Sequence, residues 1–301
     1  MPELIWQQIE ALLRSAKDRV IIVAPFIKMP IFSAAIAAIP RSVTDIMCVT
    51  RWSAEEVAAG VSDPEIMQEA LTDGRPSILL VHNLHAKLYM SDLRCLVGSA
   101  NLTAKATGKA NLPNIELLIE TAADRGEVTA LLAQLMADSI PATPTVAAEI
   151  RARADLLVEN GLVSPAIGPE RDEMTRWYPT TRAPERLYRV YLGDPRGCPH
   201  AILEGVLSDL AHLDLAPGLD RQQFGIAVLE RIYTFPEVAE LVSSGRTSSV
   251  DLEAALLATG GTSTDAAERA LILTRWLICF DALLHTVPSG PYDIVRGRQL
   301  E

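Results

Sequence analysis

Four polar side chains that could act together on a phosphate group lie within residues 85–101. His85 offers an imidazole that can attack phosphorus, and Lys87, two positions later, offers a fixed positive charge. Ser99 and Asn101 add a hydroxyl and a carboxamide that can donate hydrogen bonds to phosphate oxygens. A nucleophile surrounded by groups that stabilise developing negative charge is suited to phosphoryl transfer. These residue types therefore predict a site suited to a phosphate group.

The stretch that carries these residues is predicted to be a β-hairpin followed by a loop. Apolar residues at 88, 90, 96 and 97 mark two short strands, and the polar segment 91–94 marks the turn between them. Because side chains alternate along a strand, His85 and Lys87 are expected to share one face. Gly98 has no side chain and would let the backbone approach a ligand closely.

In these residues the chain resembles the phospholipase D superfamily. The signature of that superfamily is His-x-Lys, four residues, Asp, and then Gly-Ser-x-Asn. The chain carries it as His85, Lys87, Asp92, Gly98, Ser99 and Asn101. The gap from Asp to Gly has five residues here, where six is common in the family. The variant His-Ala-Lys-Leu-Tyr with Gly-Ser-Ala-Asn-Leu-Thr is most similar to the nuclease-type branch, which includes restriction endonucleases and phage-defence proteins. A downstream Asn-x-Glu, frequent in the family, is present as Asn114-Ile115-Glu116.

The resemblance implies a role for each residue. His85 would be the nucleophile in one subunit and the acid and base in the other. Lys87, Ser99 and Asn101 would stabilise charge on the non-bridging oxygens, and Glu116 would accept a hydrogen bond from His85. Asp92 and Gly98 are expected to be structural, with Asp92 fixing the hairpin turn. The expected chemistry needs neither a metal ion nor another cofactor, because His85 supplies the nucleophile and Lys87 the positive charge.

The family's chemistry requires two histidines at one phosphodiester, and the chain has one copy of the motif. Of five histidines (82, 85, 200, 212 and 285), only His85 is followed by lysine at the required spacing. A two-fold homodimer would bring both copies of His85 to a single site. The sequence therefore predicts a homodimer.

The substrate expected from the motif variant is nucleic acid, with DNA favoured over RNA. The formal net charge of −11 opposes general binding of polyanions. Residues 82–111 nevertheless carry four basic side chains and one acidic one. Either this is ordinary surface variation, or it marks a positive cleft in which Arg51, Lys105 and Lys109 bind substrate. Both alternatives stay open at this stage.

Apolar runs at residues 20–24, 46–50 and 77–81 predict strands, and Ser53 is expected to cap a helix. Alternating strands and helices through residue 138 predict an α/β sandwich with a mixed sheet, as the resemblance also implies. Pro141-Ala-Thr-Pro144 indicates a boundary between a catalytic domain, residues 1–143, and an accessory domain, residues 144–301. Leucine-rich amphipathic patterns predict that the second domain is mostly helical, with residues 265–286 as its central helix. This domain could bind partner proteins.

A cytoplasmic location is expected. No apolar run approaches the ~20 residues needed to span a bilayer, so membrane insertion is not expected. The first 19 residues lack the apolar block of a signal peptide. Four cysteines without paired spacing, at 48, 95, 198 and 279, indicate buried free thiols in a reducing compartment.

The function predicted is a metal-independent nuclease that acts through a phosphohistidine, in bacterial defence or in nucleic-acid processing. Two alternatives remain. One is a lipid phosphodiesterase or phosphatidyl transferase, although no basic amphipathic helix suited to a membrane surface is evident. The other is a catalytically idle subunit of a larger complex.

Overall fold

The computed structural model describes residues 4–163, 177–243, 246–258, 263–286 and 293–296. The chain forms two compact units. Unit 1 comprises Met1–Asp155 with Val163–Pro165, and unit 2 comprises Leu156–Leu162 with Ala166–Glu301.

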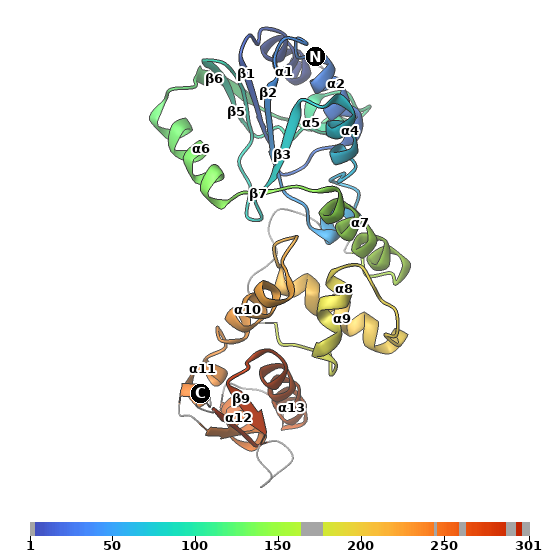
Figure 1. Ribbon diagram of the computed structural model, residues 1–301, viewed down its shortest axis with the longest axis vertical. Coiled ribbons are helices and arrows are strands. Elements are labelled where there is room, and N and C mark those ends of the chain that lie inside the picture. The colour runs from blue at the N-terminus through green and yellow to red at the C-terminus, as the bar shows by residue number, and fades with distance from the viewer. Residues whose placement is uncertain (1–3, 164–176, 244–245, 259–262, 287–292, 297–301) are drawn as a thin grey trace. The chain divides into compact units, whose positions relative to one another are not determined.

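Unit 1 is built on a seven-stranded mixed sheet with the strand order β6-β5-β4-β1-β2-β3-β7 (Figure 1). The strands are β1 (Arg19–Val23), β2 (Asp45–Thr50), β3 (Pro76–Leu80), β4 (Leu88–Ser91), β5 (Arg94–Gly98), β6 (Leu118–Ala122) and β7 (Ile140–Pro141). Strands β1, β2 and β3 pair in parallel, and the other pairs are antiparallel. The predicted α/β fold with a mixed sheet is confirmed.

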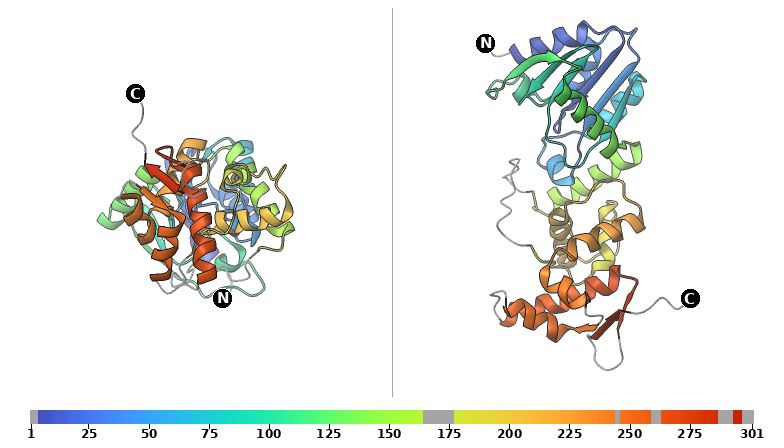
Figure 2. Two further views of the ribbon diagram at one scale, coloured as in Figure 1. Left: turned by 90° about the horizontal axis from the view of Figure 1, so that it is seen from below. Right: turned by 90° about the vertical axis from the view of Figure 1, so that its left-hand side faces the viewer.

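Helices cover both faces of this sheet, as Figures 1 and 2 show. The helices of this unit are α1 (Leu4–Arg14), α2 (Met29–Ala38), α3 (Ala54–Ala58), α4 (Ile66–Asp73), α5 (Ala104–Thr107) and α6 (Gly126–Asp138), and α7 (Pro144–Glu159) begins in it. Helix α1 buries Trp6, Ile9, Leu12 and Leu13, which lie on one side of a helix with 3.6 residues per turn. The central strand β1 is apolar on both faces, as expected for a strand that is covered on both sides.

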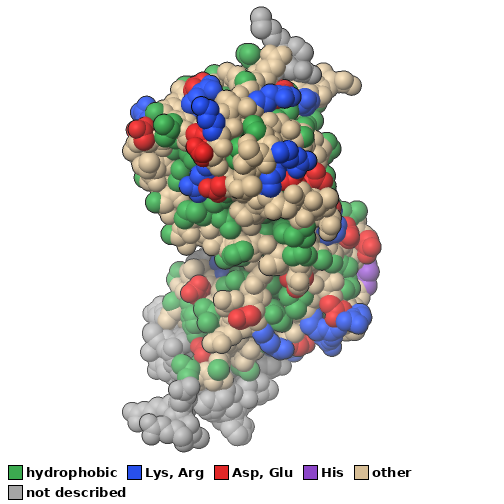
Figure 3. Space-filling view, turned by 45° about the horizontal axis from the view of Figure 1, so that its top comes forward, with side chains coloured by type: hydrophobic (Ala, Val, Ile, Leu, Met, Phe, Trp, Pro, Cys, Tyr) green, Lys and Arg blue, Asp and Glu red, His purple; other side chains and the backbone are tan. Residues whose placement is uncertain are grey.

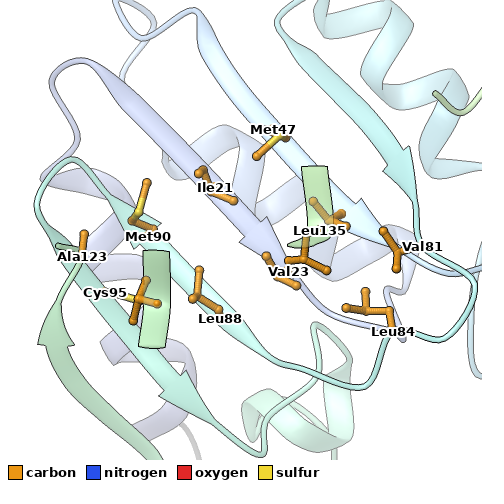
Figure 4. Close-up of a cluster of buried hydrophobic side chains, with 12 residues drawn as sticks. Ile21, Val23, Met47, Val81, Leu84, Leu88, Met90, Cys95, Ala123 and Leu135 are labelled. Atoms are coloured by element: carbon orange, nitrogen blue, oxygen red, sulfur yellow. The ribbon is translucent and has the colours of Figure 1, made fainter. Parts of the chain in front are cut away.

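The face of the sheet covered by α6 carries the cluster drawn in Figure 4. Alternate residues of β1, Ile21 and Val23, point into it, together with Met47 and Val49 of β2. Val128 and Leu135 of α6 close the cluster from the other side. Leu84 and Leu88, which flank His85 and Lys87, also belong to it. The segment that carries the motif is therefore anchored in the core at both of its ends.

The two units divide within α7, between Asp155 and Leu156, whereas the sequence suggested a domain boundary before Pro144. Pro141 belongs to the sheet of unit 1, where β7 pairs with β3 in the register Leu79↔Pro141. A proline is tolerated there because β7 is an edge strand. The first part of α7 is held to unit 1 by a bidentate ion pair, with Arg151 N–O distances of 2.7 and 3.0 Å to Glu65.

Unit 2 is mostly helical, as predicted. Its described helices are η1 (Pro184–Arg186), α8 (Leu187–Tyr191), α9 (His200–Leu213), α10 (Arg221–Ile232), α11 (Pro236–Ser243), α12 (Ser249–Ala258) and α13 (Ser263–Phe280). Trp276 and Leu277 of α13 are fully buried, in agreement with its predicted central place. The sequence did not predict the small antiparallel sheet of β8 (Arg246–Ser248), β10 (Asp293–Arg296) and β9 (Leu284–Thr286), in that order. These strands are too short to show a clear alternation of apolar and polar residues.

The surface and the cysteines bear on the remaining expectations. On the face seen in Figure 3, Lys and Arg side chains lie beside Asp and Glu side chains and form no single basic area. Cys48 and Cys95 are buried free thiols, as predicted, whereas Cys198 is half-buried and Cys279 is exposed on α13. Among the helices of the described residues, none combines the length and apolar character required to traverse a bilayer.

Candidate active site

The motif residues lie where the β4–β5 hairpin meets the loops that follow the parallel strands. His85 and Lys87 precede β4 and lie outside it, so the shared strand face predicted for them is not formed as such. The hairpin register pairs Leu88 with Val97, and the N–H of Gly98 donates to the carbonyl of Lys87 at 3.3 Å. This pairing brings the His85–Lys87 segment alongside the Gly98–Asn101 loop.

The Lys87 side chain turns back toward His85. Its ammonium donates a hydrogen bond to the His85 carbonyl at 2.6 Å, while the His85 side chain is exposed. Partial burial lowers the pKa of Lys87, and the nearby positive charge of Arg51 lowers it further, whereas the negative charge of Glu116 raises it. Lys87 thus lies in the field of one cation and one anion from other segments of unit 1.

Ser99 and Glu116 are joined directly. The Ser99 hydroxyl donates to one carboxylate oxygen of Glu116, and the Asn114 amide donates to the other at 3.1 Å. The backbone N–H of Leu117 donates to the Ser99 hydroxyl oxygen at 3.1 Å, and the N–H of Ser99 donates to the Leu117 carbonyl at 3.0 Å. The Asn-x-Glu segment is therefore bound to the Gly-Ser loop by its side chains and by its backbone.

Gly98 is required by this close packing of two backbone segments. A Cβ atom at position 98 would lie 1.9 Å from the Leu117 carbonyl oxygen and 2.9 Å from its carbonyl carbon. The sequence had suggested that Gly98 makes room for a ligand. In the structure the space beside it is filled by Leu117, because β6 pairs with β5 up to Gly98↔Leu118.

Asn101 connects the motif loop to the segment that follows β1. Its side-chain oxygen accepts a hydrogen bond from the Phe26 N–H at 3.3 Å. The N–H of the next residue, Leu102, donates to the Phe26 carbonyl at 3.1 Å. The Leu102 carbonyl accepts the N–H of Lys28 at 3.0 Å. Tyr89 supports the same loop from below, since its buried hydroxyl donates to the Ala100 carbonyl at 2.9 Å.

Asp92 lies at the opposite end of the hairpin, in a two-residue turn between Ser91 and Arg94, and has a left-handed φ of 52°. Its carboxylate accepts the backbone N–H groups of residues 17, 18 and 19 at 2.9, 3.0 and 2.9 Å. Burial opposes ionisation of Asp92, but these three hydrogen bonds outweigh it and hold its pKa below the ordinary value. The carboxylate ties the turn to the start of β1.

Arg51 leaves the end of β2 and reaches the residue before His85. One of its terminal nitrogens donates to the Leu84 carbonyl at 3.0 Å. The rest of the guanidinium forms a bidentate pair with Glu56, and its centre lies 5.3 Å from the centroid of the Phe26 ring. Three groups of the protein thus surround a side chain that sequence analysis had assigned to substrate binding.

Lys105 and Lys109, the other predicted substrate-binding residues, are both exposed near α5. The ammonium of Lys109 lies 4.4 Å from the centroid of the Trp6 ring. The Lys105 carbonyl accepts the N–H of Asn114 at 3.0 Å, so α5 also supports the Asn-x-Glu segment.

The arrangement brings the Lys87 ammonium, the Ser99 hydroxyl and the Glu116 carboxylate to neighbouring loops, and the exposed His85 imidazole lies on the same segment as Lys87. Such a set can deliver a nucleophile to phosphorus and stabilise charge on its oxygens. In the described part of the chain, no three His, Cys, Asp or Glu side chains are grouped so that they could hold a metal ion. Phe26 and Glu56 were not among the predicted site residues. The available signal was the position of Phe26 in the loop after β1 and of Glu56 in the acidic first turn of α3.

No protein-family model and no curated protein sequence matches the chain. Solved structures are similar over about half of it. Phosphatidylserine synthase from Haemophilus influenzae Rd KW20 is 14% identical, with a TM-score of 0.39, over 53% of this chain and 42% of the synthase. The chain therefore spans less than half the length of that protein.

Two smaller proteins are similar over most of their own length. Nuc from Salmonella typhimurium, a phospholipase D family member, is 19% identical, with a TM-score of 0.37, over 46% of this chain and 90% of Nuc. NucT from Helicobacter pylori is 12% identical, with a TM-score of 0.31, over 47% of this chain and 92% of NucT. Nuc belongs to the family that the motif of this chain resembles.

Proposed function

We propose that this protein is a metal-independent phosphodiesterase, most specifically a nuclease that cleaves DNA or RNA through a phosphohistidine at a site shared by two copies of the chain. The observation that carries the proposal is the joining of the two motif segments. Ser99, which pairs with Glu116, follows Gly98, whose N–H donates to the Lys87 carbonyl, and the Lys87 ammonium in turn donates to the His85 carbonyl. A cytoplasmic role in phage defence or nucleic-acid processing belongs to the same proposal.

The proposed reaction has two displacements at phosphorus. A neutral His85 imidazole attacks, a P–N bond forms, and the P–O bond to the leaving nucleotide breaks. The His85 imidazolium of the second copy gives its proton to that leaving oxygen. The same second imidazole, now neutral, takes a proton from water, which displaces the first imidazole and restores both groups. Lys87 and Ser99 stabilise the charge that develops on the non-bridging oxygens.

A second copy of the chain would supply the second imidazole. Exposed apolar side chains beside the site support such an interface: Ile115 and Leu117, on either side of Glu116, are 103% and 62% exposed. They lead into β6, which is one of the two edge strands of the sheet and exposes Ile119. Contiguous exposed apolar residues at an open strand edge favour association with another chain.

The first experiment measures cleavage of DNA and RNA in excess EDTA. We expect cleavage by the wild-type protein and a loss of at least about 1,000-fold in His85→Ala, because the nucleophile is removed. His200→Ala is the matched control, since His200 is exposed at the start of α9 in unit 2 and should leave the rate unchanged. Acid quenching followed by mass spectrometry should detect a phosphoryl adduct on His85.

Other outcomes separate the alternatives. Cleavage that EDTA abolishes would refute metal independence. Release of headgroups from phosphatidylcholine vesicles without cleavage of nucleic acid would favour the lipid phosphodiesterase. No turnover and no adduct with any phosphodiester would favour an idle subunit.

A second experiment tests whether the site is shared. Wild-type protein and His85→Ala are mixed in equal amounts and allowed to exchange subunits. The activity should then fall to about half of that of the same amount of wild type alone, because mixed dimers would lack one of the two imidazoles. Independent sites would leave that activity unchanged. Ile115→Asp should dissociate the dimer in light-scattering measurements, whereas Leu93→Asp, at a 78% exposed position in the far turn of the hairpin, should not.

A further inference from the structure

The contacts of Arg51 connect four segments that meet at the carboxyl ends of the parallel strands. Its guanidinium contacts Leu84 in the segment after β3, Glu56 in α3, and the ring of Phe26 after β1. Phe26 in turn donates its N–H to Asn101 of the motif loop. A single side chain therefore bridges the backbone that precedes His85 and the loop that carries Asn101.

Arg51 is held in place by a largely buried ion pair with Glu56. Its side chain is 19% exposed and that of Glu56 is 10% exposed. Glu56 is itself fixed in the first turn of α3, where its N–H donates to the Ser53 hydroxyl of the N-cap at 3.2 Å. An ion pair withdrawn from water in this way has a defined geometry, because breaking it would leave a buried charge without its partner.

We propose that Arg51, fixed by Glu56, is a positioning residue that holds the segment carrying His85 and Lys87 in its reactive arrangement. Its guanidinium is occupied by protein groups, so this role replaces the substrate contact suggested by the sequence. The inference rests on the phosphodiesterase function proposed above. A guanidinium is suited to the role because its planar fork can bind a carboxylate on one edge and a carbonyl from a remaining nitrogen.

The charge of Arg51 gives this role a measurable signature. Partial burial and the Arg51 charge both lower the pKa of Lys87, while Glu116 acts in the opposite direction. Glu56 neutralises part of the Arg51 charge, and His85 offers Lys87 its backbone carbonyl. Removing the positive charge at position 51 should therefore raise the pKa of Lys87. Activity that depends on protonated Lys87 would then persist to higher pH.

Two substitutions separate position from charge. Arg51→Gln removes the charge and the fork, so we expect kcat to fall by about 10- to 100-fold, as for a displacement of about 1 Å at a reacting group. The alkaline limb of the pH–rate profile should move to higher pH. Arg51→Lys keeps the charge but cannot make all the contacts, so kcat should fall while the alkaline limb stays in place.

The matched control is Arg75→Gln. Arg75 is also a buried arginine of unit 1, 9% exposed, paired with Asp73 and bonded to the carbonyls of Pro40 and Val43. It precedes β3, at the end of the sheet opposite to His85. Arg75→Gln should lower stability in the same way, yet leave the alkaline limb of the pH–rate profile unmoved.

A measurement without substrate separates this inference from the proposed function. The pKa of Lys87 can be followed in the full chain by NMR of ¹³Cε-labelled lysine, with the Lys87 signal assigned by Lys87→Arg. A higher Lys87 pKa in Arg51→Gln, but not in Arg75→Gln, supports the inference even if no phosphodiester is cleaved. An unchanged Lys87 pKa in folded Arg51→Gln would overturn the inference. If the wild type is active, an unchanged kcat and pH–rate profile in Arg51→Gln would overturn it as well.

Discussion

Replacing Gly98 by alanine tests whether the junction of the two motif segments determines the site. The added Cβ would lie 1.9 Å from the Leu117 carbonyl oxygen and 3.1 Å from the Cα of Leu118. An ordinary non-bonded separation is roughly 3.5 Å, so the Leu117 carbonyl must retreat by about 1.5 Å. The contact is with backbone, which cannot rotate away as a flexible side chain could.

The cost can be worked from the contacts at this point. The retreat would break two hydrogen bonds between Ser99 and Leu117, each contributing about 1 kcal/mol. Overpacking typically adds about 1–3 kcal/mol. The reduced freedom of the unfolded chain returns roughly 0.4–1 kcal/mol. We therefore expect Gly98→Ala to lower the free energy of unfolding by about 2–5 kcal/mol.

Activity should fall more than stability alone explains. Glu116 precedes Leu117, and Ser99 follows Gly98, so the movement displaces both partners of the Ser99–Glu116 hydrogen bond. A displacement of about 1 Å at a reacting site can cost about 100-fold in rate. The loss should be measured at a temperature where the variant remains folded.

The assays are urea unfolding followed by circular dichroism, and cleavage of DNA in EDTA. Gly126→Ala is the control, because a Cβ at this first residue of α6 would meet no atom within 4 Å. It should be neutral or stabilising by up to about 1 kcal/mol. If Gly98→Ala matched Gly126→Ala in both stability and activity, the close approach of Leu117 to Gly98 would be wrong.

Three further substitutions test other contacts. Asp92→Asn should lower the free energy of unfolding at neutral pH by about 1–2 kcal/mol, because a neutral amide accepts the three backbone N–H groups poorly. Because the pKa of Asp92 is lowered in the folded state, the stabilisation from its carboxylate is complete above the ordinary pKa and is lost as the pH falls through the folded-state pKa. The free energies of unfolding of the wild type and Asp92→Asn, measured by urea titration, should therefore converge in acid. Tyr89→Phe should cost about 1 kcal/mol, by leaving the Ala100 carbonyl without its hydroxyl donor, and thermal unfolding should show a lower midpoint. Asp209→Ala in α9 should destabilise unit 2 by about 2–4 kcal/mol, since this buried carboxylate accepts the N–H groups of Thr180 and Thr181 and the indole of Trp177; an unchanged denaturation curve by tryptophan fluorescence would contradict this.

The parts of the fold that the sequence predicts well are those fixed by local pattern. The strands around residues 20, 46 and 77 are apolar runs bounded by proline or polar residues, and each is found within one residue of its expected start. Ser53 was expected to cap a helix, and its hydroxyl accepts the N–H of Glu56 at the start of α3. An N-cap residue and the apolar run of a buried strand are patterns of a few neighbouring residues, so a single sequence is enough to predict them.

The parts that could not be predicted depend on contacts between distant segments. The role of Gly98 follows from the pairing of β5 with β6, and the contacts of Arg51 follow from the meeting of three loops. Pro141 pairs with Leu79 in an edge strand, which the prolines of this segment did not indicate. The motif spacing predicts which residues can meet, while the strand register determines which atoms they present to one another.

The charges of the site explain how an acidic chain can still be suited to a phosphodiester. Arg51 is paired with Glu56, and Lys87 lies in the field of Glu116, so each cation has a carboxylate nearby. These two cations therefore give the proposed site little net positive charge. Hydrogen-bond donors aimed at the developing charge, rather than long-range attraction, must supply the selectivity for the transition state.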